Sequence, residues 1–376
     1  MRDPRLFLIA DVGGPGLYHL GDEAMLEANI HTLRQLVPRI QFTVLSADPA
    51  WTSQRYGVQA VRWPGGLQDS TGLMVSGGGN LCDTWPAKVH ERVALLDQAQ
   101  ELGIPTAMVG QTLGPALNSE NRRLMAGPFR KLAWVGVRDD ASAALALALG
   151  TPADRVHKQL DDAFLLAPEA VEDERLDGLR GESRPWIVVT LDASFGSLHR
   201  ERSLGALASQ LDALAEVLHA AIVFVPHVGG TEVGDDWADA VAGRALAAHL
   251  RTRPLLLGLW QAREVRWLIG QSALVVSTRY HPLVFATAAG VPSLGIYVDE
   301  YTRTKLKGAL AAAGLERWCL SVGEAQRGEF LPLARDLWRQ RDAVRDRLAV
   351  LRSEACSQER RRWNEICRAL GYPGGA

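Results

Sequence analysis

The sequence has few cysteines, no excess of either charge and no long uninterrupted hydrophobic segment. Among its 376 residues are four cysteines, and none forms a C-x-x-C pair. This scarcity argues against a zinc knuckle and against the disulfide framework of a small secreted protein. We expect buried, reduced thiols, and the four positions are Cys82, Cys319, Cys356 and Cys367.

Charge and hydrophobicity limit the partners of the protein. The 41 basic and 43 acidic side chains leave a formal net charge of −2, so no overall positive field attracts nucleic acid or an anionic membrane. The first apolar run, Leu6 to Ala10, ends at Asp11 and a glycine cluster, which is typical of a strand rather than a signal peptide. The longest uncharged apolar stretch, 141–153, is too short to span a bilayer. We expect a cytoplasmic protein that binds neither nucleic acid nor membrane.

Short apolar runs alternate with amphipathic segments along most of the chain. Three runs in the first 115 residues end in glycine turns: GGPG at 13–16, SGGGN at 76–80 and GQTLGP at 110–115. Buried strands of this kind, each followed by helical periodicity, are typical of a parallel sheet in a doubly wound α/β domain. The acidic start and the apolar spacing of residues 21–38 predict the first amphipathic helix.

The length and a break in this alternation predict two domains. The polar residues 168–184 interrupt the pattern, which starts again at Trp186. We therefore expect Rossmann-like domains at 1–167 and 185–330, joined by a linker or surface helix at 168–184. Residues 331–376 are charged and helix-prone, and they form an expected C-terminal helical tail that packs on a domain or mediates homo-oligomerisation. Two such domains suit a two-substrate transferase that binds its ligands beyond the carboxyl ends of the strands.

The strongest local signal is LVVSTRYHPLVFATAAGVPSLGIY, residues 274–297. An apolar strand ends in Arg279 and His281, which would share one face of an extended segment. Pro282 suits the first position of a helix that has His281 at or near its cap and Gly290 at its end. A guanidinium and an imidazole beside a helix start predict a phosphate or carboxylate site. The alternatives are a structural salt bridge for Arg279 and a capping role for His281.

Two further segments carry candidates at strand ends. Arg138 ends an apolar strand just before the expected helix start of Asp139 and Asp140, and it is either a second anion ligand or the partner of a nearby aspartate. His227 ends the run IVFVPH, and Asp235 and Asp236 follow it.

Two motifs remain, one rich in glycine and one acidic. SGGGN is expected to bring backbone amides close to a ligand. The adjacent carboxylates of LDDAF, 160–164, would point apart, and no metal-binding motif is present, so we expect no metal.

The motifs follow the order of those in the polysaccharide pyruvyl transferase family, which the chain resembles from Leu6 to about Leu315. The matching blocks are GLYHLGDEAML, SGGGNL, GQTLGP, VRDDAS, LDDAF and STRYHPLVFATAAGVPSLGI. The resemblance implies a GT-B-like fold with two Rossmann-like domains. It also implies transfer of the pyruvyl group of phosphoenolpyruvate onto sugar hydroxyls, commonly as a ketal.

The resemblance further implies roles for particular residues. Arg279 and His281 would bind or activate phosphoenolpyruvate, and we assign general acid/base catalysis to His281 because imidazole changes charge near neutral pH. Asp22 or Glu23 would orient the acceptor hydroxyl. The expected donor-binding residues are Arg138, Arg279, His281, Gly77, Gly78, Gly79 and Asn80. The expected acceptor-binding residues are His19, Asp22 and His227. Phosphoenolpyruvate is a co-substrate, and no cofactor is expected.

Two segments depart from the family pattern. His19 stands where many members have Asn, and IYVDEYTRTKLKG, 296–308, replaces a Tyr-Asp-Pro-Lys-like segment. Both could border the acceptor, so a small glycoside is an alternative to a cell-surface polysaccharide. Two other functions stay open: a GT-B glycosyltransferase that uses a nucleotide sugar, and a catalytically inactive binding homologue.

Overall fold

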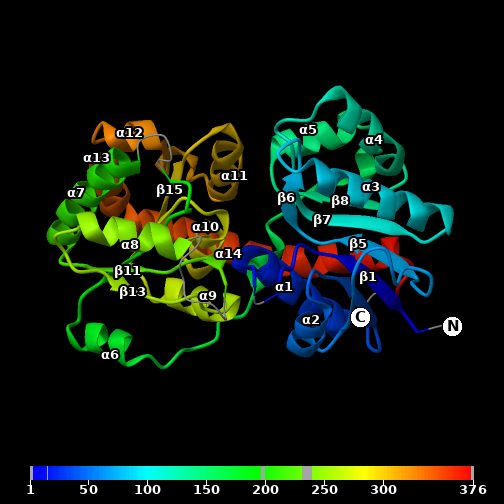
Figure 1. The fold of residues 1–376 in the computed structure, drawn as a ribbon, viewed down its shortest axis with the longest axis horizontal. Helices are drawn as coiled ribbons and strands as arrows, with labels where there is room; N and C mark the ends of the chain where they lie inside the picture. The colour runs from blue at the N-terminus through cyan, green and yellow to red at the C-terminus, as the bar shows by residue number, and fades with distance from the viewer. Residues whose placement is uncertain (1–2, 15, 196–199, 231–238, 374–376) are drawn as a thin grey trace. The chain divides into compact units, whose positions relative to one another are not determined.

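The computed structural model describes residues 3–14, 16–195, 200–230 and 239–373 (Figure 1). The chain forms two compact units. Unit 1 comprises Met1–Gly14, Asp22–Asp162 and Glu354–Ala376. Unit 2 comprises Pro15–Gly21 and Ala163–Ser353.

Unit 1 is built on a parallel sheet with the strand order β4-β3-β1-β5-β7-β8-β9, in which β6 also pairs with β7. Every strand pairing in this sheet is parallel, so all carboxyl ends lie at one edge. The strands are β1 (Arg5–Ile9), β3 (Gln41–Leu45), β4 (Gln59–Val61), β5 (Gly72–Val75), β6 (Gly78–Leu81), β7 (Thr106–Leu113), β8 (Trp134–Val137) and β9 (Val156–Lys158).

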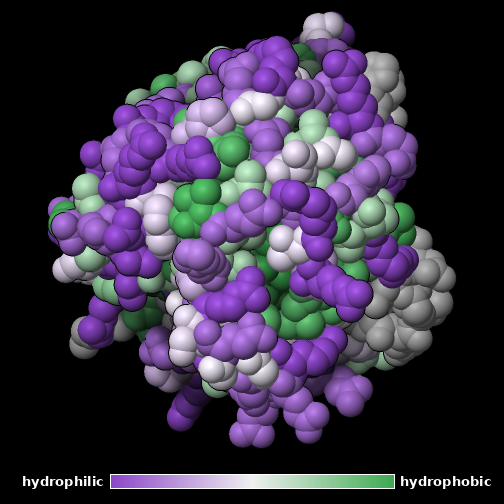
Figure 2. Space-filling model, turned by 90° about the vertical axis from the view of Figure 1, so that its left-hand side faces the viewer, coloured by the Kyte–Doolittle hydropathy of each residue, from purple (hydrophilic) through white to green (hydrophobic). Residues whose placement is uncertain are grey.

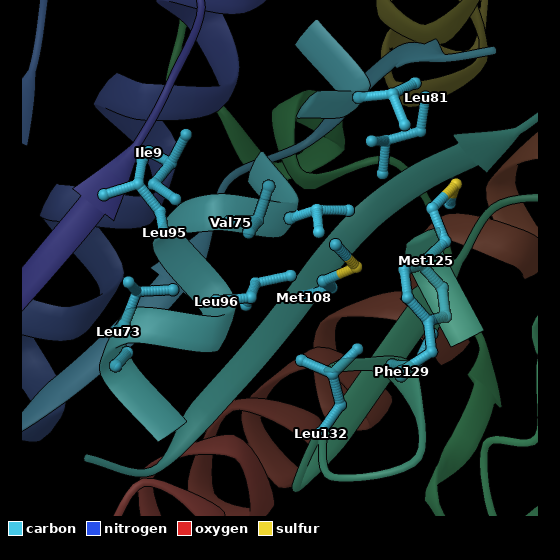
Figure 3. Close-up of a cluster of buried hydrophobic side chains, with 14 of the residues drawn as sticks. Ile9, Leu73, Val75, Leu81, Leu95, Leu96, Met108, Met125, Phe129 and Leu132 are labelled. Carbon is cyan, nitrogen blue, oxygen red and sulfur yellow. The ribbon is translucent and has the colours of Figure 1, made fainter. Parts of the chain in front are cut away.

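Helices cover both faces of this sheet, because alternate strand residues point to opposite faces. Phe7 and Ile9 belong to a core cluster with residues of α3 and α4, and Figure 3 shows Leu95 and Leu96 of α3 in this cluster. Leu6 and Leu8 belong to the cluster on the other face, with residues of α1, α2 and α14. The helices are α1 (Leu20–Leu36), α2 (Pro49–Tyr56), α3 (Pro86–Glu101), α4 (Ser119–Phe129), α5 (Asp140–Ala148) and α14 (Arg341–Ala369).

Unit 2 has a second parallel sheet, in the order β13-β11-β10-β14-β15-β16. A separate antiparallel pair joins β2 (Tyr18–His19) to β12 (Val228–Gly229). The sheet strands are β10 (Trp186–Thr190), β11 (Ala221–Phe224), β13 (Leu255–Leu256), β14 (Leu274–Ser277), β15 (Ser293–Tyr297) and β16 (Cys319–Ser321). The helices are α6 (Glu174–Gly181), α7 (Arg200–Leu218), α8 (Asp239–His249), α9 (Ala262–Gly270), α10 (Tyr280–Ala289), α11 (Glu300–Ala311), α12 (Val322–Gln326) and α13 (Phe330–Arg339). Two Rossmann-like domains confirm the predicted fold class.

The two units correspond to the expected domains except at residues 15–21, which belong to unit 2 because β2 pairs with β12. Residues 168–184 contain α6, with Leu176 buried, as the alternative of a surface helix had it. The tail packs on a domain, which was one of its two alternatives: Trp363 and Ile366 of α14 are buried in the core of unit 1, although α14 contributes residues to both units.

The surface and the cysteines also bear on the sequence predictions. On the face in Figure 2, hydrophilic residues predominate and border small groups of hydrophobic ones. Within the described ranges, no helix combines the length and the apolar character that a membrane span requires. All four cysteines are free, as expected, but only three are buried, because Cys356 lies on an exposed face of α14.

Candidate functional site

Unit 2 gathers four of the predicted site residues near the start of α10. Arg279 follows β14 and is the N-cap of α10, while His281 lies in the first turn of that helix. The predicted helix start at Pro282 is therefore wrong by two residues. The Ser277 hydroxyl accepts a hydrogen bond from Arg279 N (2.9 Å) and donates one to Arg279 O, which fixes the chain at this turn. Gly290 ends the helix in the left-handed region, as predicted.

Two carboxylates hold the guanidinium of Arg279. Asp239 accepts from Nε (3.1 Å) and Nη2 (2.6 Å), and the ion pair from Nη1 to Asp192 measures 2.7 Å. The Arg279 side chain is 21% exposed, whereas Asp239 is fully buried. The salt bridge that the sequence offered as an alternative is therefore present, but this arginine keeps an accessible part.

Asp239 also fixes the segment that carries His227. Its Oδ2 accepts hydrogen bonds from the backbone N–H groups of His227 and Val228, both at 3.0 Å. One buried carboxylate thus holds two predicted ligands, Arg279 and His227, in a fixed relation.

The imidazole of His227 is neutral at neutral pH. Burial lowers its pKa well below the usual value, and the charges of Arg279, His281 and His19 lower it further. The Thr190 hydroxyl lies 3.4 Å from Nδ1 and donates its own hydrogen to Val225 O, an arrangement that favours the tautomer with the proton on Nδ1. Nε2 then presents a lone pair, and among the described residues it has no hydrogen-bond partner. This nitrogen can accept a hydrogen bond from a hydroxyl.

His281 and His19 complete the group. The Cα of Gly21 packs directly against the His281 imidazole. The contact is so close that a Cβ on this residue would overlap Nδ1. His19 lies in β2, whose pairing with β12 brings it into register with Val228, next to His227. Arg279 and His19 also act on Asp192. Burial favours a higher pKa for this carboxyl, but Arg279, the hydrogen bonds from Ser194 and His19 together lower its pKa overall.

Together these groups are suited to hold an anion. Arg279 supplies a permanent positive charge, and the start of α10 contributes the positive end of a helix dipole. The three histidines provide neutral or positive partners at the carboxyl end of the sheet. Asp235 and Asp236, which the sequence placed after His227, lie outside the described residues.

In unit 1 the predicted anion ligand Arg138 makes the aspartate pair that the sequence offered as its alternative. Nη1 lies 2.6 Å from Asp161, Nε and Nη2 donate to Thr112, and Nη2 also donates to Gly78 O at 2.8 Å. The Arg138 side chain is only 3% exposed. Asp139 caps α5 by accepting from Ser142 N, which confirms the predicted helix start.

The SGGGN block packs closely against its neighbours, and its role as a cradle of backbone amides stays a prediction. Gly78 and Asn80 lie in β6, which pairs with β7, and Asn80 donates to Asp11. At Gly77 a Cβ would overlap the sulfur of Met25, so this glycine allows α1 to pack closely against the strand end. The block thus serves close packing in the structure.

The acidic pair of LDDAF divides as the sequence predicted, because Asp161 binds Arg138 while Asp162 binds another arginine. Asp162 Oδ1 lies 2.9 Å from Nη1 of Arg362 in α14 and accepts from Gln159 at 3.1 Å. Gly110, at a φ of +57°, makes room for this carboxylate, since a Cβ there would lie 2.5 Å from Asp162 Oδ2. The terminal helix is therefore anchored in unit 1 by a buried ion pair.

The two predicted hydroxyl-orienting carboxyls differ. Asp22 is partly exposed in the first turn of α1. Glu23 is fully buried and accepts a hydrogen bond from Tyr56. Burial raises the pKa of Glu23 to about 8, although the Tyr56 bond opposes the shift. Glu23 is thus a protonated acid at neutral pH, and the position of Asp22 suits a hydroxyl contact better.

Asp192 and Asp239 are the site residues that the sequence analysis missed. Asp192 comes two residues after β10, at the carboxyl end of a strand where ligands are expected, so its position was a usable signal. Asp239 begins a helix 40 residues before Arg279, and no local pattern connects the two. In the parts of the chain that the structure describes, no three His, Cys, Asp or Glu side chains are grouped as metal ligands would be.

Solved structures similar to this chain include UDP-N-acetylglucosamine 2-epimerases. The putative enzyme of Listeria monocytogenes has a TM-score of 0.63 at 14% identity, over 93% of this chain and 91% of that one. The S. aureus MnaA–UDP co-structure has a TM-score of 0.64 at 12% identity, over 99% and 100%. The Neisseria meningitidis enzyme bound to UDP-GlcNAc has a TM-score of 0.58 at 12% identity, over 92% and 94%. These similarities support the GT-B-like fold alone.

The sequence comparisons give a more specific result. No curated protein matches the chain. The family model described as polysaccharide pyruvyl transferase matches residues 19–300, which include both Arg138 and the Arg279–His281 segment. The chain belongs to the polysaccharide pyruvyl transferase family.

Proposed function

We propose that this protein transfers the pyruvyl group of phosphoenolpyruvate to hydroxyls of a sugar-containing acceptor, with release of phosphate. The observation that carries the proposal is the group formed by Arg279, His227 and His281 at the start of α10. Phosphoenolpyruvate bears a phosphate and a carboxylate. An accessible guanidinium and a helix start suit both groups, because each supplies charge-assisted hydrogen bonds.

In the proposed reaction His281 gives a proton to C3 of phosphoenolpyruvate, and C2 becomes electron-poor. An acceptor hydroxyl attacks C2, its proton passes to a base, and the bond between C2 and the phosphate oxygen breaks. Phosphate leaves with the electron pair of that bond. A second hydroxyl attack would give a ketal, whereas loss of a C3 proton would give an enol ether.

His227 is the proposed contact of the acceptor in unit 2, and Asp22 of unit 1 stays a separate prediction for the acceptor. The lone pair on Nε2 of His227 is suited to accept the hydrogen of an attacking hydroxyl in the tautomer with the proton on Nδ1. Arg138 stays a separate prediction as a second anion ligand, since Asp161 and Thr112 engage its guanidinium. No metal or cofactor forms part of the proposal.

Phosphate release tests the proposal. The protein is incubated with phosphoenolpyruvate and a panel of glycosides, and free phosphate is measured with and without each acceptor. We expect acceptor-dependent release that His281→Asn abolishes and that the exposed control Arg361→Gln leaves intact. Binding of a nucleotide sugar with no response to phosphoenolpyruvate would instead support a glycosyltransferase. Absence of turnover with every acceptor, despite donor binding, would support a binding homologue.

A further inference from the structure

Arg279 binds its two carboxylate partners in different ways. Asp239 takes Nε and Nη2 together, in the side-by-side geometry of a guanidinium–carboxylate pair. Asp192 takes Nη1 alone, at 2.7 Å. One edge of the fork is therefore clamped by Asp239, while the remaining nitrogen is paired with one oxygen of Asp192.

The two carboxylates also differ in how readily they could leave. Asp239 is fully buried and holds two backbone N–H groups besides the arginine, so its release would leave a charge inside the protein. The Asp192 side chain is 27% exposed, and its other oxygen accepts from the N–H and hydroxyl of Ser194 in the same loop. Water can solvate Asp192 when it moves away from Arg279.

We propose that Asp192 occupies the place of one anionic group of the donor on Nη1 of Arg279, and that the donor displaces it on binding. The proposal rests on the proposed function in one respect, that the anion is phosphoenolpyruvate. Asp239 is the positioning residue that stays, because it orients the guanidinium so that Nη1 faces the exchangeable partner. Asp192 is thus an internal competitor of the donor.

This proposal predicts a gain of affinity, which a purely structural salt bridge does not. Without the Asp192 carboxylate, Arg279 loses a counter-charge in contact with it, and anion binding should tighten about tenfold. Without the Asp239 carboxylate, the guanidinium loses its fixed orientation. Asp239→Asn should therefore weaken anion binding.

Isothermal titration calorimetry on the full chain tests the proposal with three probes: phosphoenolpyruvate, pyruvate and inorganic phosphate. The variants are Asp192→Asn, Asp192→Ala and Asp239→Asn, and thermal unfolding confirms that each is folded. Asp177→Asn, on exposed α6, is the control with the same change in net charge and should bind like the parent protein. We expect both Asp192 variants to bind phosphoenolpyruvate about tenfold more tightly, as estimated from the lost contact charge.

The three probes separate the possible failures. Tighter binding of pyruvate assigns the Asp192 place to the donor carboxylate, and tighter binding of phosphate assigns it to the phosphate. If phosphoenolpyruvate does not bind but another probe binds Asp192→Asn more tightly, Asp192 is a competitor of anions and the proposed donor is wrong. Unchanged or weaker binding of all three probes by both Asp192 variants would overturn the inference.

Discussion

Arg138 in unit 1 and Arg279 in unit 2 both lie at the carboxyl end of a strand in a parallel sheet, β8 and β14 respectively. Each follows a parallel strand and precedes a helix, and each pairs with a carboxylate. Their surroundings differ, because the Arg138 side chain is 3% exposed and the Arg279 side chain 21% exposed. Arg279 also has three histidines near it, whereas Arg138 meets a threonine hydroxyl and a carbonyl.

The comparison teaches that a strand-end arginine is not by itself a ligand site. A buried guanidinium whose hydrogen bonds are all made to acceptors of the protein stabilises the edge of a sheet. An accessible guanidinium, clamped on one side only, can exchange a partner for a ligand. By this criterion Arg279 of unit 2 is the stronger candidate for an anion ligand, and Arg138 of unit 1 is the weaker one.

The largest expected effect is on the stability of unit 1. Arg362→Gln leaves the buried Asp162 and Glu359 carboxyls without their cation, and removing one partner of a buried ion pair costs about 3–5 kcal/mol. Urea unfolding should show this loss. The adjacent exposed Arg361→Gln should change stability by less than about 0.5 kcal/mol. Equal stabilities for the two variants would mean that α14 is not anchored through Arg362.

Lysine substitutions compare the two arginines directly, because lysine keeps the charge and loses the planar fork. Arg279→Lys should lower kcat/KM for phosphoenolpyruvate about 100-fold, because the side-by-side bonds to Asp239 that orient the guanidinium are lost. Tm should fall less than in Arg138→Lys, since the Asp239 carboxylate keeps two backbone N–H donors. Arg138→Lys should mainly lower Tm, since three buried acceptors lose their donors. If Arg138→Lys instead weakens donor use as strongly and leaves Tm unchanged, Arg138 is an accessible ligand and the contrast fails.

The third prediction concerns Glu23 and pH. Its pKa is about 8 in the folded protein against an ordinary 4.5, so the folded state binds a proton more tightly than the unfolded state does. The contribution of Glu23 to stability is thus complete below pH 4.5 and is lost as pH rises towards 8. Between these pH values the unfolding free energy of the parent protein should fall more steeply than that of Glu23→Gln. The difference in slope should reach up to about 1.4 kcal/mol per pH unit. Identical pH profiles for the two proteins would show that Glu23 ionises normally; the exposed Glu174→Gln is the control.

The smallest expected effect comes from Gly21, and it tests whether the position of His281 in unit 2 matters for catalysis. Alanine at this position would push against the His281 imidazole and displace it. Gly21→Ala should lower kcat/KM for the donor about tenfold, within the cost of overpacking a well-packed site. Gly16→Ala, which adds a methyl group where nothing lies within 4 Å, should have no effect. Equal activities of the two variants would show that catalysis does not depend on the position of His281.

Much of the fold could be predicted because its signals are local. Short apolar strands, glycine turns and amphipathic spacing specify a parallel α/β sheet wherever both faces are covered by helices. The end of α10 at Gly290 followed from the same local chemistry. Its start did not, because the bonds of the Ser277 hydroxyl to Arg279 turn the chain earlier than Pro282 suggested.

The candidate site was only half predictable, for a different reason. Arg279, His281 and His227 follow strands, and that rule selects them. The main partner of Arg279 comes from a distant part of the chain, since Asp239 lies 40 residues before it. The buried pair of unit 1 is similar, because Arg362 lies 200 residues after Asp162. Pairings at such separations follow from tertiary packing, so no spacing in the sequence revealed them. The roles given to the individual side chains stay predictions.

Transfer of label from the donor is the most direct test of the central proposal. Phosphoenolpyruvate radiolabelled in its pyruvyl carbons is incubated with the protein and an active glycoside, and the glycoside is then isolated. The account predicts one label on the glycoside for each phosphate released, and no label with Arg279→Met. Labelling by Arg279→Met at the rate of the parent protein, or phosphate release that leaves the glycoside unlabelled, would contradict it.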